Sequence, residues 1–304
     1  MAKPIAEKLL NTIDCKQNAV RAVRYNTDGQ YCMTCGSNNQ LKLWNPKRGS
    51  LLATYSGHGQ EVMDAAAACD NAQLVSCGLD KNVILWDVAD ARVVRKFRGH
   101  AGCVNCVRFN EEATIVISAS LDGSVRIWDC KSNRVIQVLD EAKDSVTSLW
   151  INNHEILTGS VDGRLRKYDI RQGQLFEDYL GRPINCVSMT RDEQCLLASS
   201  LDSTVRLFDK QTGELLNSYE SHKNTQFKID CCLNNFDTHI ICGSEDGCVY
   251  TWDLVKATVT VKLLHKGVGV VSSLSPHPSE PMLLTAAEKK VFLWGPKDDD
   301  EQTT

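Results

Sequence analysis

The 304-residue sequence lacks a run of basic residues, a long apolar stretch and any segment with a sustained apolar period of 3.6 residues. It has 34 Lys and Arg against 38 Asp and Glu, and the basic residues are scattered. This distribution argues against a surface that binds nucleic acid through its phosphates. No apolar stretch approaches the roughly 18 residues of a membrane span, so we expect no membrane partner. Without a helical period, the chain is predicted to consist of strands.

The first sixteen residues contain no apolar core of a signal peptide. We therefore expect the 14 cysteines to be reduced thiols in a protein of the cytoplasm and nucleus. Two Cys-x-x-Cys pairs, Cys32/Cys35 and Cys103/Cys106, have the spacing of zinc ligands. Both lie in strand-like segments, where side chains three residues apart point to opposite faces, so we predict no metal site. No glycine-rich phosphate loop is present, and we predict no cofactor.

An aromatic residue recurs seven times along the chain, every 40–44 residues. The seven positions are Trp44, Trp86, Trp128, Tyr168, Phe208, Trp252 and Trp294. A polar residue stands six positions before each, in the order Asn38, Asp80, Asp122, Asp162, Asp202, Asp246 and Glu288. The segments between are short and alternating, and pairs such as Asp122-Gly123 suit tight hairpin turns. The chain therefore consists of seven copies of one β unit.

Gly-His pairs at 57–58 and 99–100, followed by Trp-Asp at 86–87 and 128–129, resemble the WD-repeat family. The resemblance implies an all-β, seven-bladed propeller with four strands in each blade. LLNTIDCK at 9–16 matches the segments that precede the Gly-His pairs, as in LLATYSGH. We therefore predict that residues 9–13 form the outer strand of the last blade and close the ring. We expect one propeller over 1–296 and a disordered acidic tail over 297–304.

Ser118, Asp122 and His100 are the residue types of a hydrolase triad. Ser118, however, lies in a strand-like segment four residues before the turn, whereas a catalytic serine must be exposed beside an oxyanion hole. In WD repeats such residues form a structural hydrogen-bond relay with the tryptophan. The resemblance implies two complete relays: His58, Ser76, Asp80 and Trp86, and His100, Ser118, Asp122 and Trp128. We therefore predict no catalytic residue and no enzyme activity.

The other five repeats are predicted to lack members of the relay. Repeats four and five have Tyr168, Ala198 and Phe208 at relay positions. The period assigns Lys16 to the histidine position of repeat one and Leu284 to the serine position of repeat seven. The histidines off the relay period are interpreted as isolated surface or turn residues: His154, His239, His265 and His277. We therefore expect blades two and three to be the most rigid.

Two sets of residues are candidates for partner binding. The residue before the turn Asp faces solvent in WD propellers, and four consecutive repeats carry an apolar one there: Leu79, Leu121, Val161 and Leu201. This row is either a contact patch or local packing between neighbouring loops. The resemblance also implies that the fifth residue after the histidine position lines the central mouth. Interface-type side chains stand at or beside that position, namely Arg21, Glu61, Met63 and Phe227.

Segments 93–130, 201–216 and 228–233 resemble the mitogen-activated protein kinase organizers, small seven-bladed WD-repeat scaffolds. The resemblance implies a non-catalytic scaffold, monomeric within larger complexes, whose partners are MAP kinase pathway components and spliceosomal proteins. Those roles concern the extracellular-signal-regulated kinase cascade and pre-mRNA splicing. A splicing subunit held by protein contacts remains open, as does a substrate-recognition adaptor of a ubiquitin-ligase or chromatin complex. An enzyme is the least favoured class.

Overall fold

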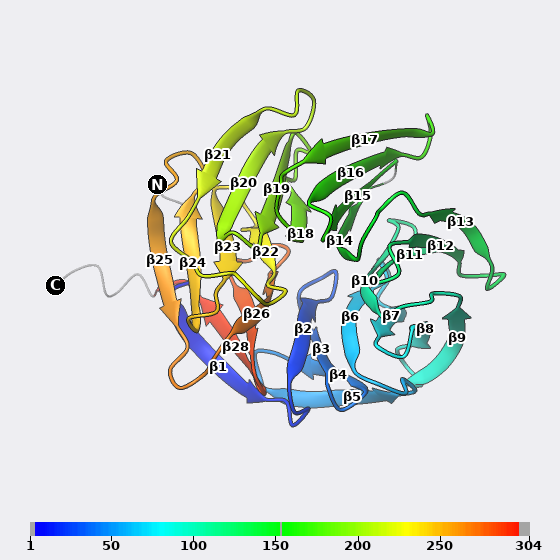
Figure 1. Ribbon diagram of the computed structural model, residues 1–304. Helices are drawn as coiled ribbons and strands as arrows, with labels where there is room; N and C mark the ends of the chain where they lie inside the picture. Colours follow the sequence, from blue (N-terminus) through cyan, green and yellow to red (C-terminus); the bar gives the residue numbers. More distant parts are fainter. Residues whose placement is uncertain (1–3, 153, 298–304) are drawn as a thin grey trace.

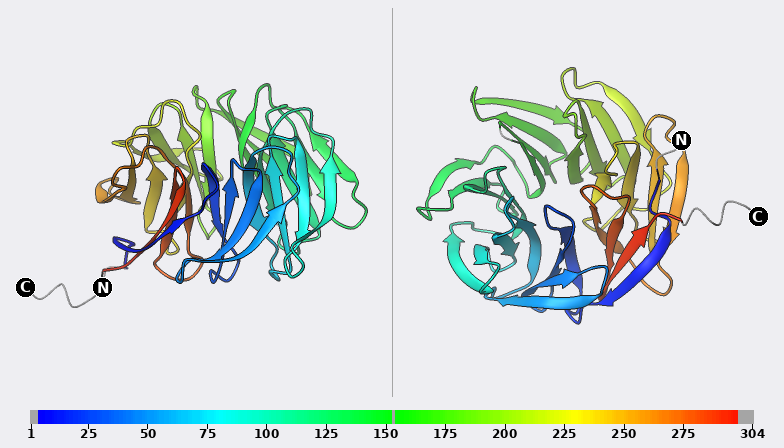
Figure 2. Two further views of the ribbon diagram at one scale, coloured as in Figure 1. Left: turned by 90° about the horizontal axis from the view of Figure 1, so that it is seen from below. Right: turned by 180° about the vertical axis from the view of Figure 1, so that it is seen from behind.

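The computed structural model describes residues 4–152 and 154–297, and within them it contains 28 strands and no helix. The strands form seven four-stranded antiparallel sheets, arranged as blades around a central axis (Figure 1). The two views in Figure 2 show the blades side by side around the ring, with strands running between its two faces. The predicted seven-bladed, all-β propeller is therefore confirmed.

The blades are numbered along the chain, and their strands are given from the innermost outward. Blade 1 contains β2 (Val20–Tyr25), β3 (Cys32–Gly36), β4 (Gln40–Asn45) and β5 (Ser50–Ser56). Blade 2 contains β6 (Val62–Ala67), β7 (Gln73–Gly78), β8 (Asn82–Asp87) and β9 (Arg92–Arg98). Blade 3 contains β10 (Val104–Phe109), β11 (Ile115–Ser120), β12 (Val125–Asp129) and β13 (Val135–Leu139). Blade 4 contains β14 (Val146–Ile151), β15 (Glu155–Ser160), β16 (Arg164–Asp169) and β17 (Gln174–Tyr179).

The remaining strands follow the same order. Blade 5 contains β18 (Ile184–Met189), β19 (Cys195–Ser200), β20 (Thr204–Asp209) and β21 (Leu215–Tyr219). Blade 6 contains β22 (Cys231–Leu233), β23 (His239–Gly243), β24 (Cys248–Asp253) and β25 (Val259–Leu264). Blade 7 contains β26 (Val271–Pro276), β27 (Leu283–Ala287), β28 (Lys290–Gly295) and, from the start of the chain, β1 (Lys8–Asp14).

The ring closes through β1, which pairs with β28 from Lys8 opposite Gly295 to Asp14 opposite Lys290. In Figure 1 these two strands, one from each end of the chain, lie side by side. This is the closure that LLNTIDCK predicted, and it leaves no unpaired edge on β28. The expected boundary at residue 296 stays a prediction, since all but the first residue of the proposed 297–304 tail lies outside the described residues.

The hydrophobic core lies between neighbouring blades. One cluster joins Phe97 of blade 2 to Val107 and Trp128 of blade 3, and the rings of Phe97 and Trp128 are 5.5 Å apart. The same arrangement recurs one junction earlier, where Tyr55 of blade 1 lies 5.6 Å from Trp86 of blade 2. The recurring aromatic therefore packs against the end of the preceding blade's outer strand. Burying such rings stabilises the contact between neighbouring blades.

The outer strands of six blades carry a β-bulge beside the recurring aromatic, and β17 does not. As a result Asp178 stands opposite Leu165, where Phe97 stands opposite Val83 in blade 2. A one-residue shift turns a side chain to the other face of the sheet. Tyr179, eleven residues after its aromatic like Phe97, is accordingly 67% exposed, whereas Phe97 is 1% exposed.

The missing bulge in β17 accompanies a shorter connection to the next blade. Five positions separate Tyr179 from Ile184, the first residue of β18, whereas seven separate Phe97 from Val104, the first residue of β10. The chain therefore has two fewer residues with which to reach blade 5, and the extra residue of the bulge is absent. The outer strand of blade 4 is thus fully exposed along its length.

Candidate functional site

The structure joins the four relay residues of blade 2 through hydrogen bonds. His58 bonds to the Asp80 carboxylate through Nδ1 at 3.0 Å and to the Ser76 hydroxyl through Nε2 at 2.7 Å. The indole Nε1 of Trp86 donates to the same hydroxyl at 2.8 Å. The hydroxyl of Ser76 is therefore fully engaged inside the blade, and the relay ties the turn to the strand that carries the tryptophan.

Blade 3 has the same arrangement. His100 bonds to Asp122 at 3.0 Å and to Ser118 at 2.8 Å, and Trp128 donates to Ser118 at 2.8 Å. Burial lowers the pKa of His100 and favours its neutral form. Burial opposes ionisation of Asp122, but hydrogen bonds from Ser124 and the Ala101 N–H hold the pKa of that carboxyl well below its usual range. Because Ser118 is fully buried and bonded on both sides, the trio acts as a brace on Trp128.

Blade 7 contains a partial relay that the sequence analysis missed. His265 Nε2 bonds to the Thr285 hydroxyl at 2.7 Å, and Trp294 Nε1 donates to that hydroxyl at 3.0 Å. The assignment of His265 as an isolated surface or turn residue was wrong, as was the choice of Leu284 for the serine position. The turn between β27 and β28 is one residue shorter than elsewhere, so counting ten positions back from Trp294 overshoots Thr285 by one.

Two further sequence assignments are corrected. In blade 1 Gln17, and not Lys16, takes the histidine position, since the Thr34 hydroxyl donates to Gln17 Oε1 and accepts from Trp44 Nε1 at 2.9 Å. His277 lies in a loop as expected but is buried, and its Nδ1 accepts a hydrogen bond from the Glu280 N–H at 2.9 Å. Each error comes from reading a position by period alone, without the burial that decides it.

In blades 4 and 5 an arginine side chain forms an ion pair with the turn aspartate. Arg166 Nη2 lies 2.7 Å from Asp162, and Arg206 Nη2 lies 2.6 Å from Asp202. In both blades the arginine follows the aspartate by four residues and replaces the histidine as its partner. The recurring aromatic, Tyr168 or Phe208, is therefore outside the polar network that fixes Trp128 in blade 3.

The four apolar rim residues lie on one face of the ring. Each donates its backbone N–H to a carbonyl just ahead of the innermost strand of its own blade: Leu79 to Glu61, Leu121 to Cys103, Val161 to Ser145 and Leu201 to Pro183. Leu121 is 57% exposed, and the other three are half-buried. The row is thus exposed at Leu121 and partly covered at its other three positions.

The candidate mouth residues surround a cavity of about 420 Å³ on that face. Arg21, Met63 and Phe227 line it, from blades 1, 2 and 6. Glu61 lies beside them, and its carboxylate accepts a hydrogen bond from Arg21 Nε at 2.8 Å. Residues more than 160 positions apart in the sequence are therefore brought to one opening. The cavity combines an exposed aromatic, a thioether and an ion pair, a mixture typical of protein interfaces.

Phe227 reaches the mouth by a different route from the one predicted. Cys231 stands opposite Cys242 as Ala65 stands opposite Ser76, so the counterpart of Met63 is the buried Ile229. Phe227 lies instead in a loop that is two residues longer, since 20 positions separate His222 from Cys242 and 18 separate His58 from Ser76. Phe227 therefore lies at the mouth as predicted, but the alignment that paired it with Met63 is wrong.

Glu245 orders this longer loop. Its Oε1 accepts the backbone N–H groups of Thr225 at 2.7 Å, Gln226 at 2.7 Å and Phe227 at 3.3 Å. Burial opposes ionisation, but these bonds hold the pKa of Glu245 below its usual range. The carboxylate thereby fixes Phe227 with half of its surface exposed at the cavity.

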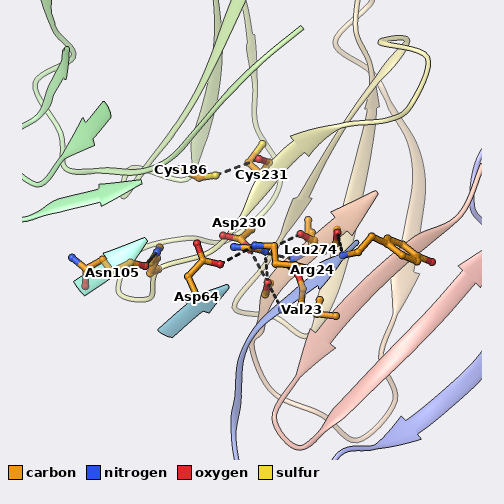
Figure 3. Close-up of polar contacts among 12 residues, drawn as sticks. Val23, Arg24, Asp64, Asn105, Cys186, Asp230, Cys231 and Leu274 are labelled. Atoms are coloured by element: carbon orange, nitrogen blue, oxygen red, sulfur yellow. Dashed lines mark hydrogen bonds and ion pairs between the residues drawn. The ribbon is translucent and has the colours of Figure 1, made fainter. Parts of the chain in front are cut away.

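A cluster of buried charges lies beneath the mouth, and the sequence analysis did not find it. Arg24 bonds to Asp64 at 2.9 Å and to Asp230 at 2.7 Å, and Arg108 bonds to Asp64 at 2.6 Å. Figure 3 shows Arg24 between the two carboxylates. Burial opposes ionisation of Asp64, but Arg108 and Arg24 hold its pKa well below the usual range. The cluster links blades 1, 2, 3 and 6. Its one signal in the sequence is Asp64, the single charged residue in the apolar run 62–68.

The two cysteines of the first Cys-x-x-Cys pair lie on opposite faces of their strand, as predicted. Cys32 and Cys35 are both buried, and they pack into two different core clusters on opposite faces of β3. Within residues 4–152 and 154–297, no group of three or more His, Cys, Asp or Glu side chains is placed to hold a metal ion. The same residues include no helix long and apolar enough to cross a membrane.

The chain is similar to known proteins over nearly its whole length. The family described as "IFT122 first beta-propeller" matches residues 3–252. Human WD repeat domain-containing protein 83 is 60% identical over 292 residues, which cover 95% of this chain and 92% of the human one. The Danio rerio protein of that name is 58% identical, covering 98% and 95% of the two chains. A Dictyostelium discoideum homolog is 34% identical, covering 97% and 99%.

Proposed function

We propose that this chain, a member of the WD-repeat β-propeller family, is a protein–protein interaction scaffold. Its partners bind at the mouth lined by Arg21, Met63 and Phe227. One observation carries this proposal. Glu245 bonds three successive backbone N–H groups and so holds Phe227 half exposed at the opening. An ordered, exposed aromatic loses little conformational entropy on binding and suits an interface anchor.

The rim extends the proposed contact surface outward from the mouth. Leu121 is the most exposed of the four rim residues and lies on the same face as the cavity. The net charge of −4 supports a protein partner over RNA, since phosphate binding needs a basic surface. We therefore place the contact on the face that carries Leu121 and Phe227.

The finer proposal concerns the partners. Segments 93–130 and 201–216 resemble the mitogen-activated protein kinase organizers, and the relatives named WD repeat domain-containing protein 83 match nearly the whole chain. On this basis the partners are components of the extracellular-signal-regulated MAP kinase cascade and spliceosomal proteins. The protein would then act as a monomer within larger complexes in both cytoplasm and nucleus. The resemblance alone supports these roles.

A second candidate is a substrate-recognition adaptor of a ubiquitin-ligase or chromatin complex. The mouth favours it, because a cavity of about 420 Å³ has the size that a few side chains of a short peptide fill. Recovery of ligase subunits or of histones would identify this function.

Affinity purification from cells, with and without ribonuclease, tests the proposal. Phe227→Ala with Met63→Ser should remove the mouth-dependent partners, and Leu121→Asp should weaken them. Leu215→Ala is the matched control, since Leu215 is exposed to the same extent as Phe227 but lies on an outer strand. Kinases without splicing factors favour signalling, and ribonuclease-resistant splicing factors favour the spliceosome. Full recovery of every partner by the folded mouth variant would contradict the proposed site.

A further inference from the structure

An aromatic side chain from the outer strand of the preceding blade fills three junctions of the ring, and among the described residues the junction between blades 4 and 5 has none in that place. At the junction of blades 5 and 6, the ring centroids of Tyr219 and Trp252 are 6.3 Å apart. Tyr55 and Phe97 pack in the same way on the tryptophan of the following blade. The corresponding residue of blade 4 is Tyr179, and it points to the opposite face because β17 has no bulge. Phe208 of blade 5 is therefore only half-buried.

A groove of about 640 Å³ occupies the place that Tyr179 leaves. Its floor is apolar, formed by Leu157 and Leu165 of blade 4 with Leu196 and Phe208 of blade 5. Its wall includes Asp178, whose carboxylate has no hydrogen-bond or ion-pair partner among the described residues. Lys167 and Lys210 also line the groove, but Lys167 Nζ lies over the Phe176 ring at 4.7 Å and Lys210 pairs with Glu155. The groove therefore combines an unfilled aromatic position with the unpaired carboxylate of Asp178.

The edge of β17 borders this groove. β17 is the outermost strand of blade 4, and all six of its residues are exposed. Bulges twist strand edges and protect them from pairing, and among the described outer strands β17 is the one that pairs without a bulge. Figure 1 shows β17 on the outer side of the ring. It presents a straight row of backbone donors and acceptors beside the exposed Phe176.

We propose that β17 and the adjacent groove bind an extended segment of a partner protein. The segment adds a fifth strand to blade 4 through main-chain hydrogen bonds, the mode known as β-augmentation. Side chains of the added strand that face blade 5 lie next to Phe176 and Asp178, which share that face of β17. An aromatic residue of the partner fills the position vacated by Tyr179, and a Lys or Arg two residues away, on the same face of the added strand, pairs with Asp178.

This site is distinct from the mouth, so the two proposals stand or fall separately. No residue that lines the groove also lines the mouth cavity. The groove lies between blades 4 and 5, whereas the mouth residues come from blades 1, 2 and 6. A scaffold with both sites holds one partner on its face and another on its flank.

Selection of displayed decapeptides against the full-length protein tests the proposal. We expect enrichment of peptides in which Phe, Tyr or Trp lies two residues from Lys or Arg, since such residues share one face of a strand. Two variants probe the site: Asp178→Lys, which reverses the charge, and Asp178→Tyr, which places an aromatic ring opposite Leu165, where Phe97 stands opposite Val83 in blade 2, and so fills the groove. Asp178→Lys should weaken binding about tenfold. Phe227→Ala, the mouth variant, should leave it unchanged.

Hydrogen exchange supplies a readout specific to strand addition. Binding of a selected peptide should slow exchange at the backbone amides of Gln174–Tyr179, which have no partner strand on their outer side. No enrichment, or binding that Phe227→Ala abolishes and Asp178→Lys does not, would overturn the proposal. A concentration-dependent dimer of the protein alone that Asp178→Lys disrupts would also overturn it, because the occupant would then be a second copy of this chain.

Discussion

Blades 3 and 5 have the same four-stranded arrangement but hold their recurring aromatic residue in different ways. In blade 3, Trp128 is bonded to Ser118, which is bonded to His100. In blade 5, Ala198 stands at the serine position and Phe208 cannot donate a hydrogen bond. The relay is buried, so its bonds are protected from water. Blade 3 therefore holds its aromatic by packing and polar contacts together, and blade 5 by packing alone.

The turn aspartates of the two blades differ in the same direction. Asp122 bonds to a histidine that is almost fully buried, whereas Asp202 and Arg206 are each 22% exposed at their side chains. A partly exposed ion pair contributes less than about 1 kcal/mol to the free energy of unfolding. A buried relay contributes more, because its loss leaves several buried polar groups without a partner. The difference teaches that a WD-type ring tolerates an incomplete relay where packing holds the recurring aromatic.

The two proposed binding surfaces also arise in different ways. The mouth uses Phe227, which Glu245 holds in a defined position. The groove exists because the junction of blades 4 and 5 was left unfilled. The two proposed surfaces therefore differ in origin: hydrogen bonds from a loop to Glu245 order one, and a change of strand register opens the other.

The largest expected effect is the loss of a relay hydroxyl. Ser118→Ala leaves the Trp128 indole N–H and a His100 nitrogen buried without a partner, and should lower the free energy of unfolding by about 2–5 kcal/mol. The matched change in blade 4 is Thr158→Val, because the Thr158 hydroxyl makes only a 3.5 Å contact with the Arg166 carbonyl. It should cost below about 1 kcal/mol. Urea denaturation of both variants measures the difference, and equal costs would contradict the contrast between the blades.

The second prediction uses pH to separate blades with a relay histidine from those without one. Burial lowers the pKa of His265 to about 4, below the usual value of about 6.5. The unfolded chain therefore takes up the proton first as the pH falls, so this stability is present above pH 6.5 and is lost toward pH 4. Between pH 7 and pH 5 the loss from His265 should be about 2 kcal/mol.

His265→Gln is the control for the pH prediction. Gln17 fills the same position in blade 1, so a glutamine can hold the threonine hydroxyl without titrating. The variant should lose about 2 kcal/mol less than the native protein between pH 7 and pH 5, measured by urea denaturation at each pH. An unchanged pH slope would show that His265 does not titrate as its burial requires.

The smallest effect is expected from restoring the relay in blade 5. Ala198→Ser combined with Phe208→Trp supplies an indole N–H and a hydroxyl to accept it, and adds ring volume beside the groove. The pair should raise the free energy of unfolding by about 1 kcal/mol, seen as a higher urea midpoint with an unchanged slope. Phe208→Trp alone, without its acceptor, should gain less. A pair no better than that single change would show that the polar bond adds nothing in blade 5.

Much of the fold can be predicted from the sequence because the same pattern of residues recurs seven times. The spacing from Trp44 to Trp294 predicts seven blades, and the likeness of LLNTIDCK to other outer strands predicts the closure by residues 9–13, which lie within the observed Lys8–Asp14. Both predictions depend on side-chain patterns that local periodicity preserves.

The register within a repeat is less predictable. One residue fewer in the turn after Thr285 hid the relay of blade 7, and two residues more before β22 misaligned Phe227 with Met63. Turn length changes register without changing the spacing rule that the aromatics follow elsewhere. A count from a single landmark therefore fails wherever a turn gains or loses a residue.

The charge cluster beneath the mouth is beyond local pattern altogether. Arg24 and Asp230 are 206 positions apart and meet only because the ring closes. The groove beside Phe208 likewise depends on how a short connection between Tyr179 and Ile184 changes the pairing of β17. Such features need the closed ring, since the residues that form them share no sequence neighbourhood.

Hydrogen exchange resolved by blade tests most directly the claim that bracing differs around the ring. Amides of β11 and β12, which carry Ser118 and Trp128, should exchange more slowly than those of the equivalent strands β19 and β20, which carry Ala198 and Phe208. The comparison pairs central strands of two blades of the same ring after correction for intrinsic rates. Equal or weaker protection in β11 and β12 would contradict the claim.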